Sequence, residues 1–464
     1  MASSSQNVLG ALDGAPLSKF HRKLVVLAGM GSFFDAMDLI IVGGIVAAVG
    51  AAWHLAPATR GLIITLNLLG MFVGAAVSGY FADRYGRKTV FAVTLLLYSI
   101  LTGVSALAWD ANSLGIIRFI AGIGIGGEIP VVVTLVSELA PSRTRGRLVV
   151  LCESFWGWGS IAAALISYLV IPHYGWRIAL LIGTLPALYV FVLRRGIPES
   201  PRFLLAKGDR EGAQRALAVA CPGVDVSVLE DTVKTQKPPL SELFRGEMLR
   251  RTLTLWVLWI TMVFSYYGIF TWLPSLLIAK GFSIQVAFLL NLLIAAFQIP
   301  GYFTAAWLVE KIGRKKTLVT FLVLCAVGAL FFAQQTLGAT PDLVLTLVWG
   351  AVIAFFNLGA WGVTYTYTPE QYPTRVRGTG AGFASASGRF VGAFGPYLVG
   401  LLLASLGGSQ YAVFITFTAI LLLGGSVVGL FGVETAGRSL EEISPDGGAT
   451  SATYPVISAA VPER

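Results

Sequence analysis

The stretch GYFADRYGRK at residues 79–88 decides how this chain is organised, because it returns as AAWLVEKIGRK at residues 305–315. Asp83 in the first copy corresponds to Glu310 in the second at an offset of 227 residues, and both copies end in Gly-Arg-Lys. An acidic residue shortly before a basic cluster, repeated at this distance, indicates that one half of the chain duplicates the other.

Two further pairs of motifs follow in the same order. SELAPSRTRG at residues 137–146 corresponds to PEQYPTRVRG at residues 369–378, at an offset of 232. PESPR at residues 198–202 corresponds to VETAG at residues 433–437 through Glu199 and Glu434, at an offset of 235. Three motif pairs at nearly constant offset predict two structurally similar halves.

The composition is that of a membrane protein. Of 464 residues, 56% are hydrophobic and only 12% are charged, and the mean hydropathy is +0.77; a soluble domain carries about 25% charged residues. Apolar runs of about 20 residues, long enough to cross a bilayer, recur along the chain. We therefore predict an all-α membrane protein with twelve spans, near residues 24–49, 61–82, 89–108, 113–139, 148–171, 176–195, 252–278, 284–309, 317–336, 343–368, 378–405 and 409–432.

The basic residues fall on one side of these spans. Of 33 Lys and Arg residues, 28 lie on that side, and the other side carries only Arg60, Arg177 and Lys280. Cytoplasmic loops are enriched in Lys and Arg, so both termini are predicted to be cytoplasmic and the net charge of +9 reflects topology rather than nucleic-acid binding. The predicted parts are a tail at 1–23, a six-helix bundle at 24–195, a loop at 196–250 with a short amphipathic helix near 208–220, a second bundle at 252–432 and a tail at 433–464.

The chain shows no sign of an enzyme or a metal protein. Cys152, Cys221 and Cys325 have no metal-ligand spacing, and no carboxylate or Cys cluster accompanies the three His residues. We expect no cofactor, no metal and no catalytic constellation. The first 23 residues lack the short apolar core and small-residue cleavage site of a removable signal peptide, and the first span is expected to be retained.

The motifs together resemble one transporter family. GxxxDRxGRK, RxxxGxG at Arg118–Gly124, the two E-x-x-P-x-R-x-R-G loops, PESPR and VETxGxxLEE at residues 433–442 are similar to the sugar porter and organic ion transporter branch of the major facilitator superfamily. The resemblance implies two pseudo-symmetric six-helix bundles that expose a central site alternately to the two sides of the membrane.

The charged loops between spans are predicted to form a cytoplasmic gate. Acidic groups of one half would pair with basic groups of the other half only when the cytoplasmic side is closed, which would set the balance between the inward- and outward-open states. The alternative is that these charges only anchor the helices at the membrane surface. The candidate gate residues are Asp83, Arg84, Arg87, Glu138, Arg143, Arg145, Glu199, Glu310, Arg314, Glu370, Arg375, Arg377 and Glu434.

Six charges lie inside the spans, where charges are costly and usually mark an ion or substrate path. They are Asp35, Asp38, Arg118, Glu128, Glu153 and Arg389. At about 1.5 Å per residue, Asp38 and Arg118 lie at matching depths, which predicts an ion pair between the first and fourth spans. The family resemblance implies that such a pair acts as a protonation switch, with a purely structural pair as the alternative. Asp35 and Glu128 are the further candidates for proton coupling.

Arg389 is predicted to lie near the middle of the membrane, about 17 Å from the cytoplasmic end of its span at Gly378. A guanidinium at this depth needs a partner, and its donors suit a carboxylate. The partner is either an internal carboxylate, with Glu128, Glu153 and Asp35 as candidates, or the substrate. In related organic ion transporters this position is Arg where anions are carried, so the resemblance implies an organic anion.

The positions that bind sugar in related porters have changed. The seventh span reads FSYYGIF at residues 264–270, so Phe264 and Ser265 replace two glutamines and Phe270 replaces an asparagine. In the fifth span Glu153 replaces a glutamine, and in the tenth Tyr365 replaces a tryptophan. Loss of these amides argues against a sugar, whereas aromatic rings can stack on a flat ligand.

Aromatic and amide side chains near the depth of Arg389 are the predicted substrate-binding groups. For each ring the alternative is packing or lipid contact, and for the amide of Gln298 it is hydrogen bonding between helices. The predicted site consists of Arg389, Glu153, Trp156, Trp158, Tyr266, Tyr267, Phe270, Gln298, Trp361 and Tyr365.

We therefore expect a secondary transporter of a small aromatic monocarboxylate. Residues 366–400 most resemble the bacterial niacin transporters, and nicotinate has the expected form of a flat ring with one carboxylate. The alternatives are a benzoate or hydroxybenzoate transporter, an organic cation transporter that uses Glu153 and Asp35, a sugar porter, or a nutrient sensor that does not transport. We expect a monomer in the inner membrane of a bacterium, with proton coupling left open.

Overall fold

The computed structural model describes residues 17–141, 144–221, 240–338, 342–373 and 376–435. All regular structure in these ranges is helical, as the sequence predicts. Most of both predicted tails and residues 222–239 of the central loop lie outside them.

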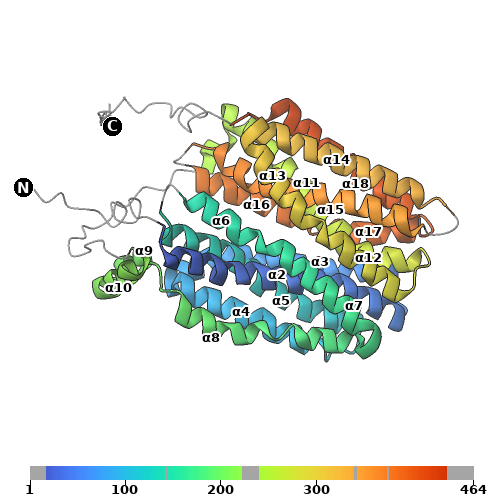
Figure 1. Cartoon of the computed structure of the whole chain (residues 1–464), viewed down its shortest axis with the longest axis horizontal. Coiled ribbons are helices and arrows are strands. Elements are labelled where there is room, and N and C mark those ends of the chain that lie inside the picture. Colours follow the sequence, from blue (N-terminus) through green and yellow to red (C-terminus); the bar gives the residue numbers. More distant parts are fainter. Residues whose placement is uncertain (1–16, 142–143, 222–239, 339–341, 374–375, 436–464) are drawn as a thin grey trace, which may run out of the picture.

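The first half of the chain forms one bundle of helices, shown in blue to green in Figure 1. Its helices pack mainly on one another, because each buries an apolar stripe against its neighbours. They are α2 (Lys19–Ala52), α3 (Pro57–Tyr85), α4 (Arg87–Ser105), α5 (Ala111–Leu139), α6 (Arg145–Glu153), α7 (Phe155–Ile182) and α8 (Pro186–Gly196).

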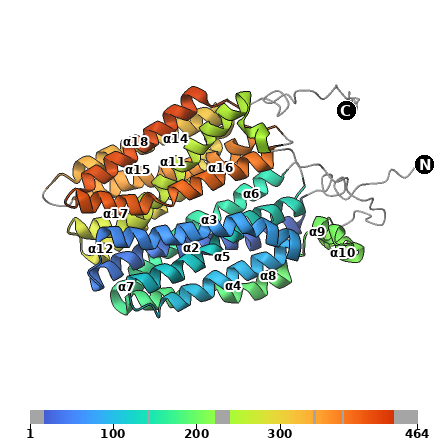
Figure 2. The same ribbon diagram turned by 180° about the vertical axis from the view of Figure 1, so that it is seen from behind.

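The second half forms a similar bundle beside the first, shown in yellow-green to red in Figure 1, and Figure 2 shows the two bundles from behind. Its helices are α11 (Gly246–Ala279), α12 (Ile284–Ala296), α13 (Gln298–Ile312), α14 (Arg314–Gln335), α15 (Leu343–Glu370), α16 (Arg377–Gly392), α17 (Gly395–Ser405) and α18 (Gln410–Phe431). Between the bundles in sequence lie α9 (Pro201–Ala206), α10 (Arg210–Ala220) and the 3₁₀ helix η1 (Leu240–Phe244); α10 confirms the predicted short helix.

The described helices form eleven candidate membrane spans, one of which is too long for a single crossing. This segment, Arg147–Gly196, has 50 residues and would extend over about 75 Å as one straight helix, against a hydrocarbon core of about 30 Å. It bends at Gly175, whose φ of 81° is not helical. The segment therefore holds the predicted fifth and sixth spans, and the chain crosses twelve times.

Three of the spans are locally irregular near the charged or polar residues that the sequence singles out. The irregular residues are Ser154, directly after Glu153, and Phe297, directly before Gln298. In the eleventh span the irregular turn follows Gly392, three residues beyond Arg389. The backbone stays in the right-handed helical region at all three places, so the spans continue through them.

The two ends of the molecule differ in how the halves meet. We call the end that carries the turns at Gly86 and Gly313 the basic end, and α9, α10 and the described ends of the chain lie there (Figure 1). At the opposite end α3 packs against α17, and Thr65 Oγ1 donates a hydrogen bond of 2.8 Å to the Ala393 carbonyl oxygen. The halves are therefore closed against each other at the opposite end.

Candidate functional site

A cavity of about 1080 Å³ separates the two halves from the basic end inward. Residues of α3, α5 and α6 line it on one side, and residues of α11, α13, α15 and α16 line it on the other. Its walls run from Glu370 and Arg377 near the basic end to Glu153 and Arg389 at depth. The structure is thus open at the basic end and closed at the opposite end.

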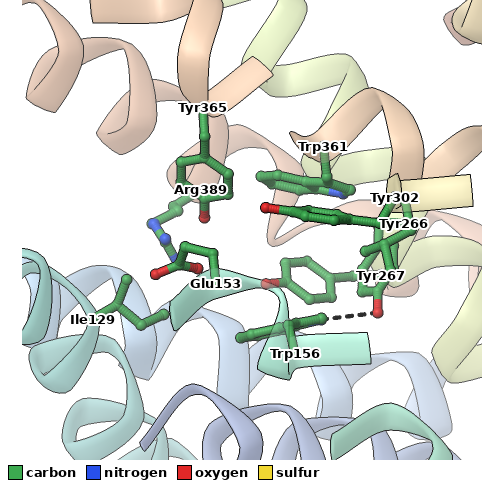
Figure 3. A pocket seen from close by; sticks show the side chains of 10 residues that line it. Ile129, Glu153, Trp156, Tyr266, Tyr267, Tyr302, Trp361, Tyr365 and Arg389 are labelled. Carbon is green, nitrogen blue, oxygen red and sulfur yellow. Dashed lines mark hydrogen bonds between the residues drawn. The ribbon is translucent and has the colours of Figure 1, made fainter. Parts of the chain in front are cut away.

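A narrower pocket continues from the deep end of this cavity, and Figure 3 shows the side chains that line it. Glu153 and Arg389 belong to the walls of both spaces, so they lie where the two meet. The remaining lining side chains are aromatic or aliphatic, namely Ile129, Trp156, Tyr266, Tyr267, Tyr302, Leu358, Trp361 and Tyr365.

Arg389 lies on α16 with its guanidinium facing this pocket (Figure 3). The side chain is only 9% exposed, and its Nε donates a hydrogen bond of 3.3 Å to Ser385 Oγ. Among the described residues no carboxylate oxygen lies within 4.0 Å of the guanidinium nitrogens. The internal partners considered from the sequence, Glu128, Glu153 and Asp35, therefore do not form an ion pair with Arg389 in this state.

The aromatic side chains surround the space beside the guanidinium. Trp361 and Tyr365 lie one turn apart on α15, with ring centroids 5.6 Å apart and planes inclined at 33°. Tyr266 approaches Trp361 edge-on, at 6.1 Å and 83°. Aromatic faces and edges on several sides of a narrow pocket suit a flat ring.

Tyr302 is a pocket residue that the sequence analysis missed. It lies on α13, one turn after Gln298, and its hydroxyl donates a hydrogen bond of 3.1 Å to the Val150 carbonyl oxygen of α6. Residues four apart lie on the same helix face. Tyr302 could therefore have been predicted from Gln298, which the sequence analysis had already placed toward the centre.

Two predicted substrate-binding residues lie behind the pocket wall. Gln298 Oε1 accepts a hydrogen bond of 3.3 Å from the Tyr266 hydroxyl, and Phe270 packs on the Tyr266 ring at a centroid distance of 5.0 Å. Both side chains are buried and neither lines the pocket. They support Tyr266 rather than face the cavity.

Trp158, predicted to bind substrate, does not line the pocket. Its side chain is 53% exposed, whereas Trp156, on the same helix, lines the pocket. Residues two apart on a helix differ by about 200° in direction, so the two rings share a depth and point to different sides.

The predicted ion pair between Asp38 and Arg118 is present. Both side chains are 1% exposed, and Arg118 Nη2 donates to Asp38 Oδ2. Thr102 Oγ1 bonds to the same carboxylate, and Asn67 Oδ1 accepts from Arg118 at 3.2 Å. The four groups form a buried network inside the first half; their part in proton coupling remains a prediction.

Asp35 and Glu128 are buried deeper in the first half. Both are fully buried, and neither lines either of the two spaces described above. Within the described part of the chain, Asp35 Oδ1 and both Glu128 carboxylate oxygens have no hydrogen-bond partner. Gly31 on α2 makes room for Glu128, since a Cβ atom there would lie 2.5 Å from Glu128 Oε1.

The ion pairs described among the candidate gate residues join groups within one half. Arg87 pairs with Asp83 at 2.8 Å and with Glu138 at 3.2 Å, and Arg314 pairs with Glu370 at 3.2 Å in the second half. Because the cavity separates the halves at this end, pairing between them is a prediction for the other state.

The acidic residues of the last motif pair cap helices. Glu199 Oε1 accepts from the backbone N–H of Arg87 at 2.9 Å, and Glu434 Oε1 accepts from that of Arg314 at the same distance. Of the other candidate gate residues, Arg84 and Glu310 are exposed and Arg377 lines the cavity. Arg143, Arg375 and the side chain of Arg145 lie outside what the structure describes.

Residues 27–446 match the family described as "Sugar (and other) transporter". This chain belongs to the sugar (and other) transporter family. The "Niacin transporter NiaP" of Acinetobacter baylyi is 46% identical over 443 residues, which cover 94% of this chain and 99% of that protein. The "Benzoate transport protein" of the same organism is 27% identical over 409 residues, which cover 86% and 87% of the two chains.

The fold of this transporter also matches those of solved transporters. The xylose transporter XylE of E. coli, in a partially occluded inward-open conformation, aligns with a TM-score of 0.74 at 17% identity, covering 91% of this chain and 100% of that one. The chain is therefore a multi-pass membrane transporter of the major facilitator type and not an enzyme. Its two halves, closed at one end and open at the other, correspond to one state of an alternating-access cycle.

Proposed function

We propose that this protein imports nicotinate across the inner membrane of a bacterium. The basic end faces the cytoplasm, in keeping with the concentration of Lys and Arg on that side of the spans. The structure then corresponds to the inward-open state, and the substrate leaves through the 1080 Å³ cavity.

The guanidinium of Arg389 carries this proposal, because it faces the pocket and no carboxylate oxygen of the described residues lies within 4.0 Å of it. A cation inside a span is costly, and the partner that suits its planar fork in two-point contact is a carboxylate. The rings of Trp156, Tyr267, Trp361 and Tyr365 line the pocket beside it. A pyridine ring with one carboxylate meets both requirements, and the name of the 46% identical relative supports the same substrate.

The direct test is uptake of labelled nicotinate by the purified protein in liposomes. Arg389→Ala should reduce uptake at least about a hundredfold, since removing a charge-assisted pair in a desolvated site costs roughly 3 kcal/mol or more. Arg389→Lys keeps the charge without the two-point contact, so its uptake should lie between that of the wild type and that of Arg389→Ala. Arg215→Ala, on an exposed position of α10, is the matched control. An Arg389→Ala variant with unchanged uptake would end the carboxylate hypothesis.

A benzoate-type acid is the second candidate, because a relative named as a benzoate transport protein covers most of the chain. The two acids share the carboxylate and the flat ring and differ in the ring nitrogen. Competition of unlabelled benzoate, nicotinate and nicotinamide against labelled nicotinate separates them. We expect nicotinate to compete best and nicotinamide, which lacks the carboxylate, to compete least.

A further inference from the structure

Glu153 is distinguished from the other carboxylates inside the spans by its access to the cavity. Asp35, Asp38 and Glu128 line neither of the two spaces at the site, whereas Glu153 lines both. It is the last residue of α6, and it lines the same pocket as Arg389 (Figure 3). Glu153 can therefore exchange a proton with the solution that fills the cavity.

The charges in the pocket balance only without substrate. Arg389 contributes one positive charge and an ionised Glu153 one negative charge, and the other lining side chains are uncharged aromatic and aliphatic groups. A substrate anion would leave one uncompensated negative charge in an aromatic, largely desolvated site, which is costly. Protonation of Glu153 restores the balance.

We infer that Glu153 carries the proton that accompanies each substrate anion, which makes the protein a proton symporter. This inference rests on the proposed function. In the outward-open state Glu153 takes up a proton from the outside solution and the anion binds to Arg389. When the basic end opens, the anion leaves into the cavity, Glu153 releases its proton to the cytoplasm, and the remaining carboxylate again balances Arg389.

The groups that face Glu153 from the surrounding helices are consistent with this role. The charged and titratable side chains that line the pocket with Glu153 are Arg389 on α16, Tyr266 and Tyr267 on α11, Tyr302 on α13 and Tyr365 on α15. Arg389 is the one cation among them. When a substrate carboxylate neutralises Arg389, the ionised form of Glu153 loses its stabilising charge, so anion binding and proton uptake favour each other.

The other carboxylates are less suited to carry the coupled proton. Asp38 is held by Arg118 and Thr102 in the buried network of the first half. Asp35 and Glu128 are sealed from the cavity, so they reach solution only through other groups. Glu153 alone among the four combines exposure to the cavity with a place beside the proposed anion site.

Glu153→Gln tests this assignment, because the amide mimics the protonated acid. In liposomes with an acidic outside, the wild-type protein should accumulate nicotinate about tenfold for each pH unit of gradient, if one proton enters with each anion. Glu153→Gln should show no accumulation above protein-free liposomes, yet still exchange labelled for unlabelled nicotinate. Glu211→Gln, the same change at an exposed position of α10, should behave as wild type.

A binding measurement gives a second readout without a membrane. In weakly buffered detergent solution at pH 8, nicotinate binding to the wild-type protein should remove about one proton from solution per ligand, and binding to Glu153→Gln should remove none. Accumulation by Glu153→Gln, unchanged proton uptake, or loss of nicotinate binding by this variant would each overturn the inference. If the wild-type protein itself neither binds nor exchanges nicotinate, the proposed function fails; if it does both without responding to the pH gradient, only the symport inference fails.

Discussion

The indole N–H of Trp156 donates a hydrogen bond of 2.9 Å to the hydroxyl of Tyr266, and this bond joins the two halves of the molecule. Trp156 lies on α7 of the first half and Tyr266 on α11 of the second. The same hydroxyl lies 3.3 Å from Ser160 Oγ and donates to Gln298 Oε1 at 3.3 Å. The junction forms part of the pocket wall, so the closed arrangement of the halves depends on a residue that the proposed substrate would touch.

Tyr266→Phe should shift the protein toward the outward-open state. The Trp156–Tyr266 bond exists in the state open at the basic end, so its loss destabilises that state alone. A lost buried hydrogen bond costs about 1 kcal/mol, which changes the ratio of the two states roughly fivefold. The shift can be measured as faster reaction of Thr65→Cys with a maleimide, because the three native cysteines are buried. Tyr372→Phe is the matched control, since its hydroxyl bonds to Thr252 within the second half. Equal labelling rates in the two variants would contradict this role.

The Asp38–Arg118 pair should stabilise the first half chiefly by avoiding an unpaired charge. Arg118→Leu leaves the Asp38 carboxylate buried without its cation, which costs roughly 3 to 5 kcal/mol. The double change Asp38→Asn and Arg118→Leu removes both charges and should lower the thermal unfolding midpoint less than Arg118→Leu alone. The unfolding midpoints of Arg118→Leu, Asp38→Asn and the double variant are measured in detergent. If the loss in the double variant equals the sum of the losses in the two single variants, the two residues are not directly coupled.

The glycines before α4 and α14 should tolerate no side chain. Gly86 and Gly313 have φ values of 96° and 98°, and a Cβ atom at Gly313 would lie 2.6 Å from Glu434 Oε2. Alanine at either position should destabilise the protein by about 1 to 3 kcal/mol, both through backbone strain and by displacing the capping carboxylate. Gly79→Ala is the control in α3, because nothing lies within 4 Å of its added Cβ. Similar unfolding midpoints for Gly79→Ala and Gly86→Ala would show that the strain is absent.

Features that depend on the order and depth of residues could be predicted from the sequence. The duplicated motif around Gly86 and Gly313 predicted two matching halves, and both copies form the same turn with a capping glutamate. Arg389 could be predicted to face the candidate site, because a charge inside a span is too costly to keep without a role, and it lines the pocket. Depth along the helix also paired Asp38 correctly with Arg118.

Features that depend on the direction of a side chain around its helix could not be predicted in this way. Trp156 and Trp158 have nearly the same depth, and only packing against α2 and α12 decides which of them faces the pocket. Gln298 likewise has the depth of the site, but its side chain bonds to Tyr266 and does not line the pocket. The choice of the state open at the basic end is likewise a property of the whole packing and not of any motif.

Bulky side chains at the seam between α3 and α17 should prevent the two halves from closing at the end opposite the basic end. A Cβ atom on Gly400 would lie 2.9 Å from the Pro57 carbonyl carbon, and one on Gly61 would lie 2.9 Å from Tyr397 Cα, so backbone meets backbone across the two halves. Gly61→Val or Gly400→Val adds side-chain atoms to a contact with no room for them, which costs about 1 to 3 kcal/mol or more in the closed arrangement. Because the opposite end must close before the basic end opens, nicotinate uptake into liposomes should fall at least about tenfold while binding in detergent persists.

A second measurement follows the opening of the seam. When Thr65→Cys is added to the same variants, the introduced cysteine should react faster with a maleimide. Gly79→Val, on α3 with no atom near its added Cβ, should transport as the wild type does; rapid uptake by Gly61→Val would instead mean that the seam can open and close with a side chain inside it.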